Sequence, residues 1–88
     1  MTRRLSPAER REQLLEASIR VFARLGYGGT RMEDLANEAG VANSLFSQHW
    51  PTKEAIFLDA RDRVRRESLD VARRAIDRAS PSSSAEIR

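Results

Sequence analysis

The sequence predicts a small all-α fold, in which a three-helix domain with a helix-turn-helix is followed by a long fourth helix. Apolar residues recur at helical spacing in four segments, and these segments begin or end with residues that cap helices. No segment alternates apolar and polar residues with the period of two that half-buried strands show. A length of 88 residues is enough for one small domain.

The first helix is expected to begin at Pro7, because proline suits the first helical position. Ser6 and Glu9 have the spacing of a capping box around this start. Gly26 is expected to end the helix in a left-handed conformation, with Tyr27 packing back on its last turn. The face expected to pack consists of Leu14, Leu15, Ser18, Val21, Phe22 and Leu25.

The second and third helices are expected to form the helix-turn-helix. The second opens with a capping-box sequence at Thr30-Arg31-Met32-Glu33 and ends at Gly40, which lets the chain reverse. The third is short, about residues 43–49. The small side chain of Ala36 is expected to let the third helix cross close to the second. Val41 and Phe46 are expected to anchor the turn in the core. The expected buried face of the second helix consists of Met32, Leu35, Ala36 and Ala39.

The fourth helix is expected to begin near Thr52 and to stop at Ser80-Pro81. Its apolar stripe consists of Phe57, Ala60, Val64, Ser68, Val71, Ala75 and Ala79. The chain is therefore expected to have four parts. They are a flexible basic arm at residues 1–6, the helix-turn-helix domain at 7–55, a connecting helix at 56–80, and a linker or the start of an absent domain at 81–88.

Composition limits the classes of function. The chain has no cysteine, one histidine, no nucleophile–base pair and no metal-ligand spacing, so we expect neither an enzyme nor a cofactor. No apolar run is long enough for a signal peptide or a membrane span, so a cytoplasmic location is expected. The net charge is +3, yet residues 32–60 hold five acids and one lysine. Charge alone therefore does not locate a nucleic-acid site.

The third helix carries the candidate site for base recognition. Its outward positions are expected to be Asn43, Ser44, Ser47 and Gln48, which are short, neutral and polar. Asn and Gln side chains can each make two hydrogen bonds with adenine in the major groove. A polar face that contacts only water is the alternative for any one of these residues. Four of them on a short helix after such a turn favour readout of DNA bases.

Several short motifs occur in a specific order within residues 11–57. They are Leu14-Leu15-Glu16-Ala17, Val21-Phe22, Gly26-Tyr27, Thr30, Leu35-Ala36, Ala39-Gly40-Val41 and His49-Trp50-Pro51-Thr52-Lys53-Glu54-Ala55. This pattern resembles the TetR family of repressors. The resemblance implies a three-helix DNA-binding domain, which the fourth helix links to a larger helical domain outside this chain. In that family the larger domain forms a homodimer and binds a small-molecule inducer.

The sequence departs from the family pattern around the third helix. Ala42 stands where serine is common, so the cap of the third helix is expected to fall to Asn43. Leu45 stands where threonine is common, and Ser47 stands where an aromatic residue, usually tyrosine, is expected. Trp50 replaces the usual phenylalanine and is expected to lie in the core.

Phosphate contacts are expected on both sides of the third helix. The resemblance implies that His49 donates to a phosphate, and Lys53 lies at the start of the fourth helix, where backbone N–H groups attract phosphate. A half-buried ring and a solvated lysine are the alternatives. Thr30, Arg31 and Leu45 complete the expected set. The two arginines before the first helix either enter a minor groove or form a solvated tail.

These observations predict sequence-specific binding of double-stranded DNA by a TetR-like transcriptional regulator in the bacterial nucleoid. The resemblance implies a repressor that is released by an inducer bound outside this chain. The alternative is a helical protein–protein interaction module without a DNA role, in which arginines of the fourth helix such as Arg61 and Arg73 contact an acidic partner. The salt dependence of binding to random duplex DNA discriminates between the two.

Overall fold

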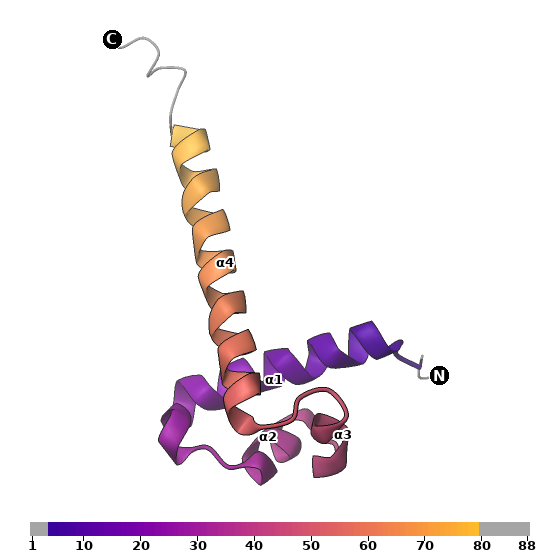
Figure 1. Ribbon diagram of the computed structural model, residues 1–88. Coiled ribbons are helices and arrows are strands. Elements are labelled where there is room, and N and C mark those ends of the chain that lie inside the picture. The colour runs from indigo at the N-terminus through magenta and orange to yellow at the C-terminus, as the bar shows by residue number, and fades with distance from the viewer. Residues whose placement is uncertain (1–3, 80–88) are drawn as a thin grey trace, which may run out of the picture.

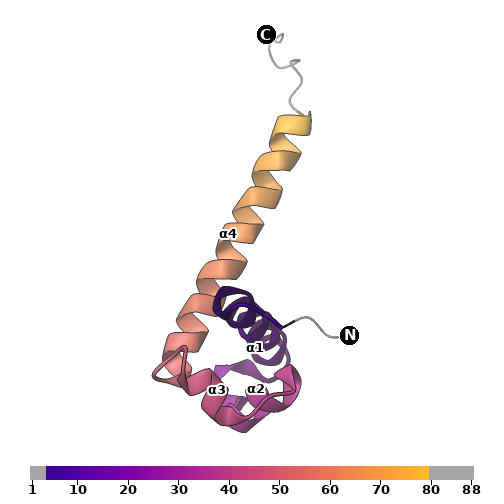
Figure 2. The ribbon, with the colours of Figure 1, turned by 90° about the vertical axis from the view of Figure 1, so that its right-hand side faces the viewer.

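The computed structural model describes residues 4–79, which form four helices and, within that range, no strand. The helices are α1 (Pro7–Gly29), α2 (Met32–Ala39), α3 (Asn43–Ser47) and α4 (Lys53–Ala79). α2 and α3 lie on one side of α1, whereas α4 crosses its other side and continues away from the molecule (Figures 1 and 2). The predicted all-α fold with a helix-turn-helix is confirmed. No helix in the described part is long and apolar enough to cross a membrane.

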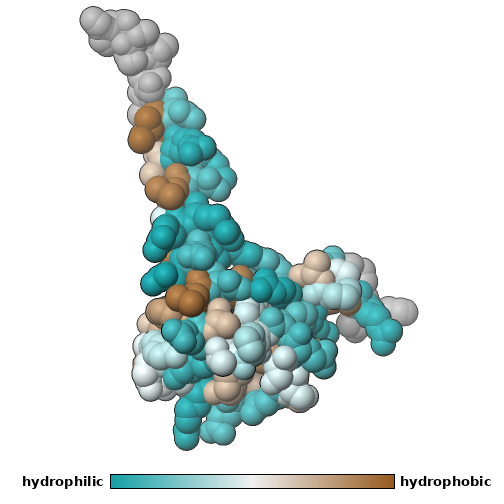
Figure 3. All heavy atoms as spheres, in the orientation of Figure 1, coloured by the Kyte–Doolittle hydropathy of each residue, from teal (hydrophilic) through white to brown (hydrophobic). Residues whose placement is uncertain are grey.

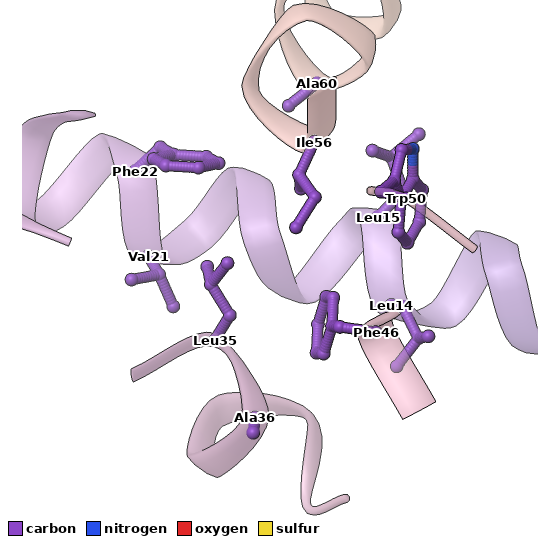
Figure 4. Close-up of a cluster of buried hydrophobic side chains, with 10 residues drawn as sticks. All are labelled: Leu14, Leu15, Val21, Phe22, Leu35, Ala36, Phe46, Trp50, Ile56 and Ala60. Atoms are coloured by element: carbon purple, nitrogen blue, oxygen red, sulfur yellow. The ribbon is translucent and has the colours of Figure 1, made fainter. Parts of the chain in front are cut away.

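One hydrophobic core joins the four helices. Figure 4 shows Ile56 of α4 on one side of α1 and Leu35 of α2 on the other, with Phe46 beside them. The core consists of Leu14, Leu15, Val21, Phe22, Leu35, Ala36, Phe46, Trp50, Ile56 and Ala60. Full burial of a large apolar side chain contributes about 1.5–3 kcal/mol. This core therefore fixes α3 against α1, and it confirms the predicted burial of Trp50.

The start of α1 agrees with the prediction, but its end differs. Ser6 Oγ accepts from Glu9 N at 3.1 Å, and a Glu9 carboxylate oxygen accepts from Ser6 N at 2.9 Å, which is a capping box. Gly26 breaks the helix with φ 77° and ψ 164°, yet α1 resumes for one more turn to Gly29. The predicted break at Gly26 with a positive φ is confirmed, but its ψ is extended rather than that of the left-handed helix, and a further turn follows.

Near this break the predicted packing of α1 is only partly correct. Tyr27 packs back on Phe22, with ring centroids 6.2 Å apart, as expected. Ser18 is buried, as expected, and donates to Leu14 O at 2.8 Å. Leu25 is 42% exposed, so its predicted burial is wrong. It lies beyond the last core residue of α1.

The predicted capping box of α2 is also wrong. Arg31, not Thr30, is the N-cap residue, and the carboxylate of Asp34, not of Glu33, accepts from Arg31 N at 2.9 Å. The Thr30 hydroxyl instead donates to Gly26 O at 2.6 Å. Thr30 thus satisfies a carbonyl at the break in α1, and the start of α2 moves by one residue.

The turn between α2 and α3 forms as predicted. Gly40 ends α2 in the left-handed conformation, with φ 73° and ψ 34°. Val41 N donates to Ala36 O at 3.0 Å, which satisfies a free carbonyl of α2. α3 ends at Ser47, two residues before the predicted end at His49. Its N-cap is Ala42 rather than Asn43, because Ala42 is extended and Asn43 is already helical.

α4 starts as predicted, since Thr52 Oγ1 accepts from Ala55 N at 3.1 Å. Its buried face differs from the predicted stripe: Ile56 is fully buried, whereas Phe57 is only half-buried. Further along the stripe, Val64 and Val71 are 44% and 59% exposed, so their predicted burial is wrong. Among residues 4–79, neither valine belongs to the hydrophobic core or packs against it. The predicted stop at residues 80–81, the linker and Arg3 of the arm lie outside the described residues.

Candidate nucleic-acid interface

α3 lies at the surface of the molecule, at the end opposite to the projecting part of α4 (Figure 1). Phe46 attaches it to the core with no exposed surface, and Leu45 packs against the core while half-buried. The four side chains predicted to face outward, Asn43, Ser44, Ser47 and Gln48, are all exposed. The fold therefore presents them together on one free side of a short helix.

These four side chains have unused hydrogen-bonding capacity. None of them forms a hydrogen bond or an ion pair with the rest of residues 4–79. The amides of Asn43 and Gln48 each offer a donor and an acceptor, and each serine offers a hydroxyl. An exposed face of this kind can pair with the edges of bases, because those edges also present donors and acceptors.

Basic residues surround the C-terminal end of α3. His49 is half-buried, with its ring centroid 5.7 Å from that of Trp50. Gln48 and His49 line an open cleft of about 530 Å³ together with Arg4 and Arg10 from the start of α1. Sequence reasoning did not single out Arg10. Its charge was visible, but no local pattern indicates that the start of α1 lies beside the end of α3.

Lys53, which we predicted to contact phosphate, already has protein partners. Its ammonium donates to Tyr27 O at 3.0 Å and to Thr30 O at 2.9 Å, and it lies 4.2 Å from the centroid of the Tyr27 ring. Lys53 therefore joins the start of α4 to the connection between α1 and α2. One of its three N–H donors has no partner among these contacts.

The other predicted phosphate residues differ in how available they are. Thr30 is 1% exposed and uses its hydroxyl inside the protein. Leu45 has no side-chain donor, and its backbone N–H donates to Ala42 O at 3.0 Å. The Arg31 side chain is 76% exposed and makes a long contact of 3.5 Å with Glu33. Arg31 and His49 thus have the most accessible donors of the five.

A cluster of three residues connects α1, the segment after α3, and α4; we call it the Asp59 cluster. Trp50 Nε1 donates to Asp59 Oδ2 at 2.7 Å, and Arg11 Nη2 contacts the same oxygen at 2.7 Å. The Arg11 guanidinium lies 4.6 Å from the centroid of the Trp50 ring. The Trp50 hydrogen bond and then Arg11 lower the pKa of Asp59, which outweighs the opposing effect of burial.

Acidic residues near α3 are engaged by arginines of α1. Glu38 pairs with Arg20 at 2.9 Å and with Arg24 at 3.4 Å, and the hydrogen bond from Arg20 is the main cause of its lowered pKa. On the α4 side, Glu12 forms a bidentate pair with Arg63, which lowers the pKa of Glu12. Two of the five acids in residues 32–60, Glu38 and Asp59, are thus paired with arginines of α1.

Comparison with known proteins places the chain in a family. The family model described as bacterial regulatory proteins, tetR family, matches residues 14–60. The HTH-type transcriptional regulator RutR of Escherichia coli (strain K12) is 32% identical over 62 residues, which are 70% of this chain and 27% of that protein. The HTH-type transcriptional regulator LuxR of Vibrio harveyi is 41% identical over 51 residues, 58% of this chain and 25% of that protein.

A third relative is the HTH-type transcriptional activator FasR of Mycolicibacterium smegmatis, 40% identical over 55 residues, 62% of this chain and 25% of that protein. The chain thus spans about a quarter of the length of these relatives. No solved structure matches it. The descriptions of the family and of these relatives are those of transcriptional regulators and not of enzymes. The chain belongs to the TetR family of bacterial regulatory proteins.

Proposed function

We propose that this chain binds double-stranded DNA in a sequence-specific manner by placing α3 in the major groove. The observation that supports this proposal is an exposed, uncharged face on a helix that the buried Phe46 holds in place. The face consists of Asn43, Ser44, Ser47 and Gln48. The major groove admits an α-helix and presents a distinct pattern of donors and acceptors for each base pair. A face with these groups and no competing partners within residues 4–79 suits that pattern.

Asn43 and Gln48 are the principal base readers in this proposal. They are five positions apart, which at about 1.5 Å per residue separates them by roughly 7.5 Å along the axis. Base pairs are spaced by about 3.4 Å, so the two amides meet different base pairs. Ser44 and Ser47 have shorter side chains and lie between them. Ser47 takes the place of the family's usual aromatic residue and offers a hydroxyl there.

Phosphate contacts position α3 in the groove. We assign the strongest of these contacts to Arg31 and His49 and add Arg10 from the cleft beside Gln48. Lys53 contributes through its remaining donor, and its main role is to hold the connection between α1 and α2. Thr30 and Leu45 support the interface from within, because their donors are engaged.

In the whole protein we propose a cytoplasmic, nucleoid-associated repressor. It would act as a homodimer, with dimerisation and inducer binding in a region outside residues 1–88. Helix-turn-helix dimers bind two half-sites about one helical turn or a multiple apart, so one copy of this chain reads one half-site. One relative is named as an activator, so the direction of regulation needs its own test. Transcription from the target promoter in cells with and without the protein decides it.

Selection of bound duplexes from a random DNA library tests the proposed function. Asn43→Ala and Gln48→Ala should each lower affinity for the selected duplex by about 1–3 kcal/mol and relax the preference at one base pair. Asn37→Ala removes an exposed amide from α2 and serves as the matched control, with affinity and preference unchanged. Intact preference in both α3 variants would exclude α3 as the reader.

The alternative function is a helical interaction module without a DNA role. The exposed apolar side chains of α4, such as Val71 and Ile76, are the observation that favours it. Affinity for random duplex DNA, measured against salt concentration, separates the two functions. The logarithm of a DNA binder's affinity falls steeply and linearly with the logarithm of salt concentration, because its phosphate contacts release counterions from the DNA. Absence of any measurable binding at low salt would favour the interaction module.

A further inference from the structure

The end of α3 is tied to Trp50 by backbone and ring contacts. His49 N and Trp50 N both donate to Phe46 O at 3.0 Å. The Trp50 ring lies 6.0 Å from that of Phe46 and 5.7 Å from that of His49, and Trp50 is only 4% exposed. A movement of the indole would therefore move the last turn of α3. Gln48 lies in that turn, whereas Asn43 lies at the opposite end of the helix.

The indole N–H has one hydrogen-bond acceptor among the described residues. Its N–H donates to Asp59 on α4 at 2.7 Å, and Arg11 of α1 contacts the same carboxylate oxygen. A hydrogen bond with an ionised acceptor is stronger than one between neutral groups. The Arg11–Asp59 pair is weaker, because both side chains are more than 40% exposed and water screens them. The Asp59 cluster therefore acts mainly through the indole.

We propose that Asp59 is a positioning residue for DNA recognition: by holding the Trp50 indole, it fixes the end of α3 that carries Gln48. This inference rests on the proposed function, because it requires that α3 reads bases. A phenylalanine at position 50 would have no N–H to donate, so the role of Asp59 depends on the tryptophan. Asp59 lies on α4 and is not part of the reading face.

The test measures base preference at two positions. The base pairs read by Asn43 and by Gln48 are first identified with the alanine variants described above. Asp59→Leu is then expected to lower affinity for the selected duplex about tenfold, within the range of coupling energies between contacting residues. Preference should relax at the base pair of Gln48 and remain at that of Asn43. A merely structural role would weaken both positions equally, and that result would overturn the inference.

Three further variants sharpen the test. Asp59→Asn keeps an oxygen that can accept the indole N–H, so it should retain affinity within about threefold. Trp50→Phe should relax preference at the base pair of Gln48, and adding Asp59→Leu to it should change affinity by less than about twofold. Asp62→Leu removes an exposed carboxylate from the next part of α4 and is the matched control, with no expected change.

All binding is measured where urea unfolding shows each variant to be folded. If Asp59→Leu does not fold, Trp50→Phe alone decides: unchanged preference at the base pair of Gln48 overturns the inference. A full effect of Asp59→Leu in the Trp50→Phe background also overturns it. Failure of the proposed function looks different, since Asn43→Ala and Gln48→Ala would then leave sequence preference intact.

Discussion

The two ends of α4 differ in what surrounds them, although both carry apolar residues at helical spacing. Near the start, Ile56 and Ala60 are 0% and 4% exposed against α1. Farther out, Leu69 and Ile76 are 60% and 66% exposed. Figure 3 shows separate brown patches, amid mostly hydrophilic surface, along the projecting part of α4. We call residues 64–79 the outer α4 and residues 4–63 the packed end.

This difference teaches where the stability of the chain lies. The packed end has a shared core and ion pairs between helices, such as Arg11–Asp59 and Glu12–Arg63. The outer α4 packs on no other described helix, and its helical form depends on local contacts such as Arg63–Glu67 at 3.9 Å. Most helical stability in proteins comes from packing. The outer α4 should therefore contribute little to the free energy of unfolding, and the proposed DNA-reading surface on α3 should not depend on it.

Truncation of a core side chain should give the largest effect. Phe46→Ala is expected to lower the free energy of unfolding by about 3–5 kcal/mol, because Phe46 is fully buried and the substitution leaves a cavity. Ile76→Ala on the outer α4 is the control and should change it by less than about 0.5 kcal/mol. Urea unfolding followed by circular dichroism measures both. Similar losses in the two variants would show that the contrast between the two regions is wrong.

The break in α1 should give the next largest effect. Gly26 has φ 77° and ψ 164°, a combination that is nearly restricted to glycine. A Cβ there would meet no atom within 4 Å, so the cost of Gly26→Ala is backbone strain, about 1–3 kcal/mol. Gly28→Ala is the matched control, because its φ is not positive and its surroundings are open. Equal stability of the two variants would exclude strain at position 26.

Acid should weaken the packed end by a smaller amount. Arg63 lowers the pKa of Glu12, and Trp50 and Arg11 lower that of Asp59, from ordinary values of 4.5 and 3.8. The contribution of these ionised carboxylates to the unfolding free energy is fully present above their ordinary pKa values. It is lost as pH falls through their lowered pKa values in the folded protein. Because both side chains are over 40% exposed, the loss is at most about 1 kcal/mol after solvent screening.

Urea unfolding between pH 6 and pH 3 measures this loss. Glu12→Gln and Asp59→Asn should each flatten the dependence of the unfolding free energy on pH. Ile76→Ala on the outer α4 removes no titratable group, so it is the control and should leave the dependence unchanged. If the unfolding free energy of the double variant Glu12→Gln, Asp59→Asn still fell with pH as in the parent chain, these two carboxylates would be excluded as the cause.

The smallest effect is expected on the outer α4. Leu69→Gln combined with Ile76→Gln should leave DNA affinity unchanged and shift the unfolding free energy by less than about 0.5 kcal/mol. We also expect the chain by itself to sediment as a monomer at micromolar concentration. A tight dimer that this double variant dissociates would show that the outer α4 has a partner, and the contrast drawn above would then apply only to the monomer.

Much of the local structure could be predicted from the sequence. The capping box at Ser6 and the left-handed turn at Gly40 depend on residues within a few positions of one another, and both formed as predicted. The exposure of Asn43 and Gln48 followed from the burial of Phe46 on the opposite face of the same short helix. Helical spacing determines which residues share a face, and that information is local.

Only the tertiary structure decided which of these faces have partners. Ala60 and Val71 both belong to the predicted stripe of the fourth helix, but only Ala60 is part of the core. We predicted Lys53 to be a free cation at a helix start. In the structure its ammonium instead binds carbonyls of a segment more than twenty positions away. Arg11 and Asp59 meet across 48 positions. Burial and pairing of charges depend on which segments meet in space, and no pattern within one turn of helix contains that information.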